Sequence, residues 1–171
     1  MASLAERGGV AGTSGRPAAR SVGIAALAAA APAIAATYES GKYEGHTAQI
    51  NKATGEHRKF ELRADAVNSE VTGIKFYATG TCSDGGKSYG LQGKKPNRLF
   101  GDVDENGHFK VVAHSTSGGT TVTVVGDLAG TKASGWFTVK SRFNSKTNES
   151  DPNGSIRCTT GKVHWSAKKT G

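Results

Sequence analysis

Apolar and polar residues alternate along most of the chain from Thr37 onward, and turn residues interrupt them about every ten positions. A period of two places successive side chains on opposite faces of a strand, so each segment is expected to have one buried and one solvated face. Short strands at this spacing favour a sandwich or a barrel over βαβ units. The sequence therefore predicts an all-β fold, a single antiparallel β-sandwich or barrel-like domain.

The predicted strands share this alternation and are bounded by turn residues. They are Tyr43–Ile50, Arg58–Ala64, Val71–Thr79, Ser88–Gln92, Leu99–Asp102, His108–Ser115, Thr120–Leu128, Gly135–Phe143, Ser155–Cys158 and Lys162–Lys168. Asn106-Gly107 suits a two-residue hairpin turn, since both positions tolerate a positive φ. Asn144–Gly154 has no apolar residue and is predicted to be an exposed loop. A helix competes only around Phe60–Val71, where the pattern is ambiguous.

The N-terminus has the three parts of an export signal. Arg7, Arg16 and Arg20 precede an uncharged, Ala-rich stretch, Val22–Ile34, and Ala33-Ile34-Ala35 fits the small-x-small pattern of a cleavage site. At about 13 residues the stretch is too short for a stable membrane span, which needs roughly 20. The alternative is an Ala-rich helix of the folded domain. We interpret residues 1–35 as a signal peptide.

The remaining residues, 36–171, form the predicted domain, secreted or held at the surface of a bacterial cell. No second apolar stretch follows, so the mature chain is expected to have no stable membrane span. In an oxidising compartment the two cysteines, Cys82 and Cys158, are predicted to form a disulfide. They lack the C-x-x-C motif and the spacing of a zinc site. Their separation of 76 positions implies a stabilisation of roughly 4.5 kcal/mol in the chain-entropy model.

The net charge of the chain indicates what kind of surface the domain favours. The chain carries a formal net charge of +8, and the first 35 residues contribute only +2, from three arginines and one glutamate. A basic mature protein favours contact with anionic surfaces, such as wall polymers, acidic polysaccharide, lipid headgroups or nucleic acid, and the charge does not choose among them. For an exported domain, the predicted partner is an anionic cell-wall polymer, a polysaccharide or another surface protein. The basic groups Lys94, Lys95 and Arg98, and Lys168 and Lys169 at the tail, lack the interleaved aromatic residues of an RNA-binding sheet. No nucleic-acid partner is therefore predicted.

Two aromatic side chains are predicted to face outward. If Phe137, Val139 and Phe143 face the core, Trp136 points to solvent, and Tyr77 opposes Phe76 in the same way. An exposed aromatic ring on a sheet is suited to stacking against a sugar ring or another flat apolar surface. The alternatives are that both faces of the sheet are covered, or that Trp136 closes one end of the core.

An acidic turn resembles the first half of a calcium-binding loop. Asp102, Asp104 and Asn106 place oxygen donors at positions one, three and five, and Gly107 stands at position six. Position twelve is Ala113, where a bidentate glutamate is expected. A plain acidic hairpin turn is therefore the favoured interpretation, with a weak calcium site as the alternative.

No catalytic residue set and no cofactor are predicted. The five histidines form neither H-x-H nor H-E-x-x-H, and no G-x-S-x-G motif is present. A Ser–His–Asp set or a pair of acids across a cleft can still assemble from distant positions. The favoured hypothesis is a non-catalytic binding module. The alternative is an extracellular hydrolase acting on glycan or ester substrates.

The C-terminal half carries a pattern of turn glycines, strand aromatics and one cysteine, G-x-F/L…A-x-G-x-F…C-x-x-G-x-V-x-W-x-A. Here it is Gly126-Asp127-Leu128, then Ala133-Ser134-Gly135-Trp136-Phe137, then Cys158-Thr159-Thr160-Gly161-Lys162-Val163-His164-Trp165-Ser166-Ala167. Upstream, Tyr43-x-Gly45-x-Thr47 and a strand around Phe60 fit the same plan. In these features the chain resembles small secreted bacterial proteins of unknown function. The resemblance implies a β-sandwich or barrel and supplies no activity.

Overall fold

The computed structural model describes residues 38–89 and 99–171, all within the compact unit Ile34–Gly171. The predicted signal peptide, residues 1–35, lies outside the described residues, as do Lys94, Lys95, Arg98 and the end of the predicted strand Ser88–Gln92. The described part is all-β, which confirms the predicted fold class. It contains no helix that is long and apolar enough to cross a membrane.

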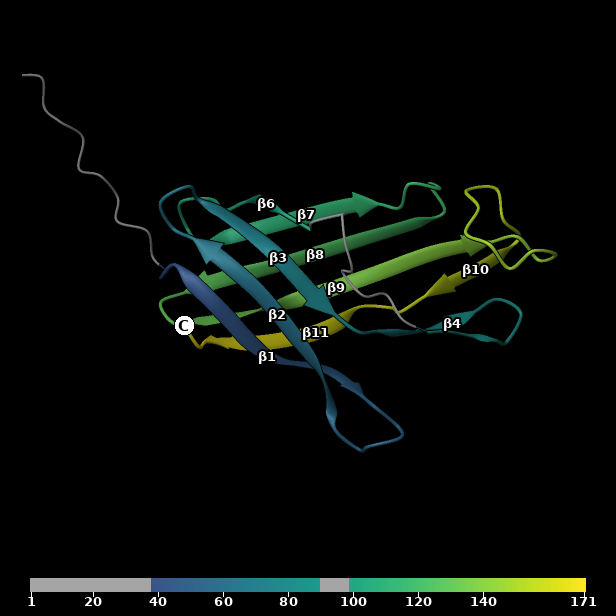
Figure 1. Cartoon of the computed structure of the whole chain (residues 1–171), viewed down its shortest axis with the longest axis horizontal. Helices are drawn as coiled ribbons and strands as arrows, with labels where there is room; N and C mark the ends of the chain where they lie inside the picture. The colour runs from purple at the N-terminus through teal and green to yellow at the C-terminus, as the bar shows by residue number, and fades with distance from the viewer. Residues whose placement is uncertain (1–37, 90–98) are drawn as a thin grey trace, which may run out of the picture. The chain divides into compact units, whose positions relative to one another are not determined.

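Every pairing between the named strands is antiparallel (Figure 1). The strands are β1 (Gly41–Ile50), β2 (His57–Asp65), β3 (Glu70–Phe76), β4 (Thr79–Cys82), β5 (Lys87–Tyr89), β6 (Gly101–Asp102), β7 (His108–His114), β8 (Thr120–Ala129), β9 (Lys132–Phe143), β10 (Ile156–Thr159) and β11 (Val163–Lys169). Asn144–Gly154 contains no strand and connects β9 to β10, as the sequence predicts.

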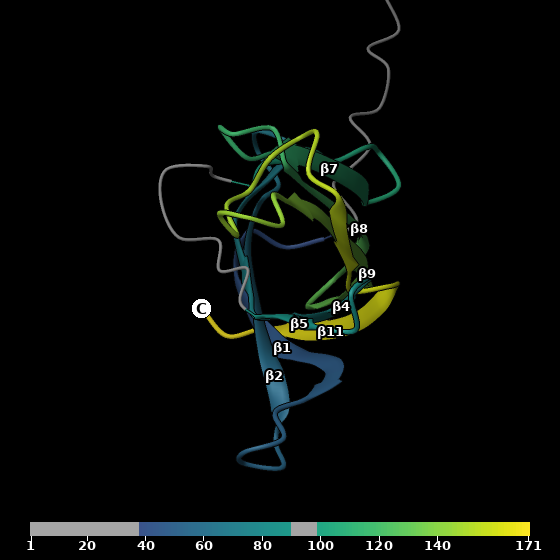
Figure 2. The same cartoon turned by 90° about the vertical axis from the view of Figure 1, so that its right-hand side faces the viewer.

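The sheet curls, so of the two predicted architectures the barrel-like one is found. Hydrogen-bonded neighbours run in the order β7-β8-β9-β11-β1-β2-β3-β6. The two ends of this path meet at an isolated bridge between Val103, just after β6, and Phe109 of β7. Viewed from one end, the strands curve round a common interior (Figure 2). This curvature follows from the right-handed twist that accumulates between neighbouring strands.

The sheet also forks at β9. One edge of β9 pairs with β8, while its other edge pairs first with β11, through Lys132–Phe137, and then with β10, through Lys140–Phe143. Thr160 bridges the fork, because its Oγ1 accepts from the Val139 amide at 2.9 Å and its amide donates to the Val139 carbonyl at 3.0 Å. The second branch of the sheet, β10-β4-β5, is thus hydrogen-bonded to β9, which is also part of the curled path that runs from β7 to β6.

Stacked aromatic rings fill the interior. Phe60 and Trp165 stack with their centroids 4.1 Å apart, and Phe76 and Phe137 do so at the same distance. Phe109 packs at a tilt against Trp165 at 6.2 Å. All five rings belong to one cluster of buried apolar residues. Burial of large aromatic side chains supplies the main stabilising term for a core of this kind.

Two glycines paired across β8 and β9 make room for this cluster. Gly126 and Gly135 are register partners, and a Cβ at either would lie within 3 Å of the Trp165 ring. A Cβ at Gly126 would also lie 2.7 Å from the Phe109 ring. Neither buried ring can move without displacing its stacking partners. Gly126 is therefore required by the positions of the Trp165 and Phe109 rings, whereas a Cβ at Gly135 would first meet the Val125 carbonyl oxygen of β8.

One predicted strand is wrong. Val71–Thr79 is not continuous, because β3 ends at Phe76 and β4 begins at Thr79. The chain changes partners at this point, from β2 to β10. Gly73, with a φ of 60°, lies in a bulge of β3 opposite β2, which bends the strand ahead of the break. The alternation alone carries no sign of this change of partner.

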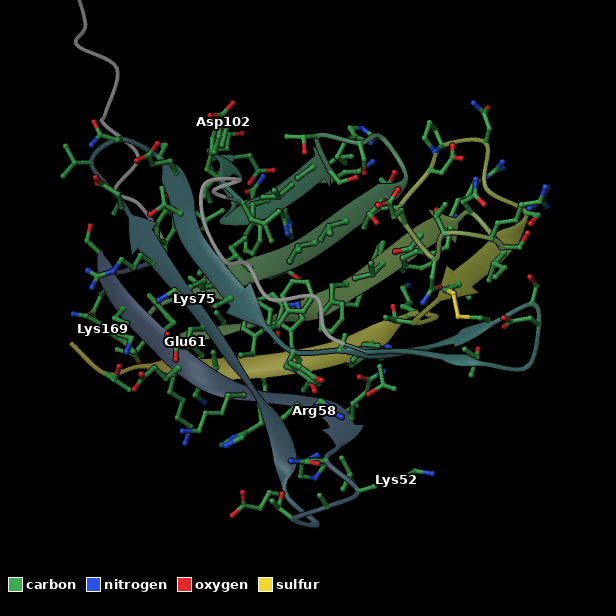
Figure 3. All side chains as sticks on the ribbon, turned by 45° about the vertical axis from the view of Figure 1, so that its right-hand side comes forward. Lys52, Arg58, Glu61, Lys75, Asp102 and Lys169 are labelled. Atoms are coloured by element: carbon green, nitrogen blue, oxygen red, sulfur yellow. A yellow bond between two sulfur atoms is a disulfide. The ribbon has the colours of Figure 1, made fainter. Side chains whose placement is uncertain are left out.

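The predicted disulfide is confirmed. Cys82 of β4 and Cys158 of β10 are register partners and are joined through their sulfur atoms, drawn in yellow in Figure 3. The bridge therefore crosslinks two strands of the second branch. At the other end of β4, the Gln49 side chain exchanges two hydrogen bonds with the Thr79 backbone, at 2.8 and 2.9 Å. The branch is thereby fixed at both ends.

We expect removal of the disulfide to destabilise the domain by roughly 4.5 kcal/mol, because the crosslink restricts the unfolded chain over 76 positions. Denaturant unfolding of the Cys82→Ala/Cys158→Ala double variant against the oxidised protein measures this difference. The oxidised and reduced wild type should differ by a similar amount. Equal unfolding midpoints in all three samples would contradict the role assigned to the bridge.

We expect Gly126→Ala to destabilise the domain by about 1–3 kcal/mol through overpacking against Trp165 and Phe109. Chemical denaturation measures the loss. In the Trp165→Leu background the same substitution should cost less, because the smaller side chain leaves space for the methyl group. Strictly additive effects in this double-mutant cycle would show that Gly126 is not required by the Trp165 ring.

Candidate binding face

The strands of the sheet differ sharply in charge. Strands β1, β2 and β3 carry five Lys or Arg residues (42, 58, 59, 63 and 75) and four acids (44, 61, 65 and 70). Strands β7 to β11 carry seven Lys or Arg residues (110, 132, 140, 142, 157, 168 and 169) and a single acid, Asp127. In the first group, Glu61 lies within 4 Å of the amino groups of Lys42 and Lys75. Glu61 and Lys75 are labelled in Figure 3. Strands β7 to β11 therefore carry most of the unneutralised positive charge.

Alternation places all of these cations except Lys169 on the outside of the curl. Phe109, Val124, Phe137 and Trp165 are buried, so their neighbours along each strand point outward and are exposed or half-buried. We call the outward residues at the centre of these strands, together with Lys162 just before β11, the basic face. They are Lys110, Val112, His114, Thr121, Thr123, Val125, Trp136, Thr138, Lys140, Arg142, Arg157, Thr159, Lys162 and His164.

Trp136 lies at the middle of the basic face, on the outward side that the sequence predicts for it. It is half-buried, and its register partners are Val125 of β8 and His164 of β11. Val125 in turn pairs with Lys110 of β7. The amino group of Lys162 lies 4.4 Å from the centre of the indole ring. The face thus combines an aromatic surface with cations on both sides, as an anionic sugar polymer would need.

The second predicted stacking residue, Tyr77, lies in a different setting. It directly follows β3, is half-buried, and has the guanidinium carbon of Arg58 at 4.3 Å from its ring centre. Arg58 also donates a hydrogen bond to Thr79 Oγ1 at 2.9 Å. Tyr77 belongs to the lining of a wide hollow of about 960 Å³ beside the β1–β2 turn. The two aromatic–cation pairs are separate, and only Trp136 is part of the basic face.

The acidic turn joins β6 to β7. Asp104 Oδ1 accepts hydrogen bonds from the backbone amides of Asn106 and His108, both at 2.9 Å. The hydrogen bond from the His108 amide is the main cause of the lowered pKa of Asp104. Asp102 and Asn106 are exposed. Over residues 38–89 and 99–171, no three His, Cys, Asp or Glu side chains form a group able to hold a metal ion. Asp104 thus organises the turn itself.

A serine hydrolase needs a serine, a histidine and an acid within reach of one another. One hollow of about 560 Å³ has these residue types in its lining, as His46, Asp127, Ser134 and Ser166. His46 and Ser166 are register partners on β1 and β11. Asp127 is on β8, three strand spacings from β1, or roughly 14 Å. Its carboxylate is bound to His108 instead. Within the described ranges no histidine ring nitrogen is hydrogen-bonded to a serine hydroxyl. These residues share a surface but form no relay.

The sequence analysis does not predict one group of cations on the basic face, which consists of Lys140 and Arg142 of β9 and Arg157 of β10. The spacing of Lys140 and Arg142 is visible in the sequence and places them on one face. Arg157, 15 positions away, joins them only through the register, which pairs it directly with Arg142. Of the basic residues singled out from the sequence, Lys168 points outward on β11, and Lys169 pairs with Glu39 at 2.8 Å.

No known family model, no curated protein and no solved structure matches this chain.

We expect the Asp127→Asn substitution to lower the pKa of His108. The hydrogen bond to the Asp127 carboxylate, aided by its charge, raises this pKa above the usual 6.5. The pair therefore stabilises the fold fully below pH 6.5, and this contribution is lost as the pH rises through the raised value. Titration of the His108 ring by NMR measures the shift, with Asp151→Asn as the control. An unchanged pKa in the Asp127 variant would contradict the pairing.

Proposed function

We propose that the protein is an exported, non-catalytic binding module that holds an anionic polysaccharide, at the cell surface or in the medium, on its basic face. The observation that carries this proposal is the distribution of charge. Strands β7 to β11 have a single carboxylate among seven lysines and arginines, and Trp136 lies among these cations. An extended polymer that carries regularly spaced negative charges matches such a surface better than a compact ligand does.

The sugar rings of the polymer would contact the middle of the face. Val125, Thr138 and Trp136 present a half-buried, mainly apolar strip across β8 and β9. Val112 of β7 extends it, with 49% of its surface exposed. Aromatic and aliphatic groups pack against the apolar faces of sugar rings, while threonine hydroxyls can hydrogen-bond to the ring substituents. The flanking lysines and arginines would bind the acidic groups.

Export is part of this proposal, and the disulfide supports it. A structural disulfide forms and persists in an oxidising compartment, where a surface polymer is also found. The N-terminal pattern of residues 1–35 supplies the route. The resemblance to small secreted bacterial proteins agrees with the same location.

We expect the full protein to be retained on insoluble cell-wall polysaccharide and to be released when the anionic groups of the polymer are removed or neutralised. Trp136→Ala should weaken retention by roughly three- to tenfold, through loss of ring stacking. Phe100→Ala removes an aromatic ring that is 65% exposed but outside the basic face, and serves as the matched control. Depletion from the supernatant measures the bound fraction.

Three outcomes would contradict the proposed function. They are retention at background level, equal retention before and after removal of the anionic groups, and equal losses from Trp136→Ala and Phe100→Ala. Binding that depends on a protein component of the wall would instead assign the face to a surface protein. Retention should also fall with added salt, since the screening length shortens from about 10 Å at 0.1 M to about 3 Å at 1 M.

A further inference from the structure

A hollow of about 420 Å³ lies at the junction of β8, β9 and β10, where the basic face is most positively charged. Its lining includes the cations Lys140, Arg142 and Arg157, together with Gly118 and Gly119 of the β7–β8 turn, Thr121 of β8 and Pro152 of the Asn144–Gly154 loop. We call it the β9–β10 hollow. Its charged residues come from two adjacent strands and point to the same side of the sheet.

The pairing of two arginines in this hollow is unfavourable in the absence of an anion. Arg142 and Arg157 lie directly opposite each other, with an expected Cβ separation of roughly 5 Å. Like charges at such positions destabilise a sheet. In the described part of the chain, no carboxylate lies within 4 Å of Lys140, Arg142 or Arg157. The Arg142 guanidinium donates a hydrogen bond to the Pro152 carbonyl, at 3.4 Å.

The walls of the hollow are held in place by covalent and backbone bonds. Arg157 is followed directly by Cys158, whose disulfide ties β10 to β4. The Asn144–Gly154 loop packs closely on Gly119, where a Cβ would lie 2.5 Å from the Asp151 amide nitrogen. Asp151 donates that amide to the Arg142 carbonyl at 3.0 Å. The cations are thus attached to a fixed backbone, which lowers the entropic cost of binding.

We propose that the β9–β10 hollow is a binding site for a tetrahedral oxyanion, a sulfate or phosphate group carried by the polysaccharide. A carboxylate has two coplanar oxygens, which one guanidinium fork satisfies. Two guanidinium groups and an amino group offer more donors than two coplanar oxygens accept, whereas a tetrahedral group presents a further oxygen to the third cation. Its charge also offsets the repulsion between Arg142 and Arg157. The proposal deepens the proposed function by naming the group that the face recognises.

The test uses inorganic sulfate and phosphate at constant ionic strength, so that it does not depend on polymer binding. We expect saturable NMR shifts at the amides of residues 118–121, 140–142 and 157–159, and weaker effects from acetate. Arg142→Gln and Arg157→Gln should each weaken binding by roughly fivefold or more. Lys59→Gln and Lys75→Gln, on β2 and β3, are the matched controls and should change nothing.

Thermal unfolding separates a binding role from a structural one. Without anion, Arg142→Gln should unfold at the same temperature as the wild type or higher, because the like-charge pair is relieved. Sulfate or phosphate should raise the unfolding temperature of the wild type more than that of the variant. A variant that is less stable in both conditions, or shifts that spread over all lysines and arginines without saturating, would overturn the proposal.

A comparison of binding to three polymers then identifies the source of the anion. A sulfated glucan, a phosphate-bearing glucan and a carboxylated glucan of matched length and charge should bind in an order that places one of the first two ahead of the third. If free sulfate or phosphate binds in the hollow but no polymer is retained, the site stands and the polysaccharide function fails. If polymers bind equally well to the wild type and to the Arg142→Gln/Arg157→Gln variant, the site fails and the function stands.

Discussion

Strand β9 is the element on which the other parts of this fold depend, because it is hydrogen-bonded to three strands at once. It pairs along one edge with β8 and along the other with β11 and then β10. Thr160 satisfies the Val139 backbone groups where the two partners meet. The inward side of β9 contributes Phe137 to the aromatic core, and its outward side contributes Trp136, Lys140 and Arg142 to the basic face. The same register therefore fixes the core and the candidate site.

This coupling restricts how the strand can be placed. A slip of one residue in β9 would turn Phe137 to solvent and bury Trp136 and its charged neighbours. It would also separate Gly126 from Gly135, whose pairing leaves room for the Trp165 ring. Apolar packing on the inside thus determines which cations meet on the outside. The close approach of Arg142 and Arg157 is compatible with this fold because the core and the Cys82–Cys158 bridge hold β9 and β10 in register.

The sequence predicts the local features well. Alternation identifies most strands and assigns Phe60, Phe109, Phe137 and Trp165 to the buried side, and the cysteine count predicts the disulfide. Prediction from the sequence fails where long-range strand pairing determines the structure. The break between β3 and β4 follows from a change of partner strand, which leaves the alternation of Val71–Thr79 intact. Likewise, no local pattern shows that Arg157 pairs with Arg142, or that Lys162 lies over Trp136. The sequence therefore predicts the aromatic residue of the candidate site but not the β9–β10 hollow.

We propose above that an anionic polysaccharide binds on the basic face and not on the mixed-charge strands β1 to β3. A titration of the ¹⁵N-labelled protein with a soluble anionic oligosaccharide, followed by amide chemical shifts, locates the bound surface. We expect a contiguous set of shifts on β7, β8, β9 and β10, with the Trp136 indole signal among them. Shifts confined to β1, β2 and β3, or an unperturbed Trp136 indole at saturation, would contradict it.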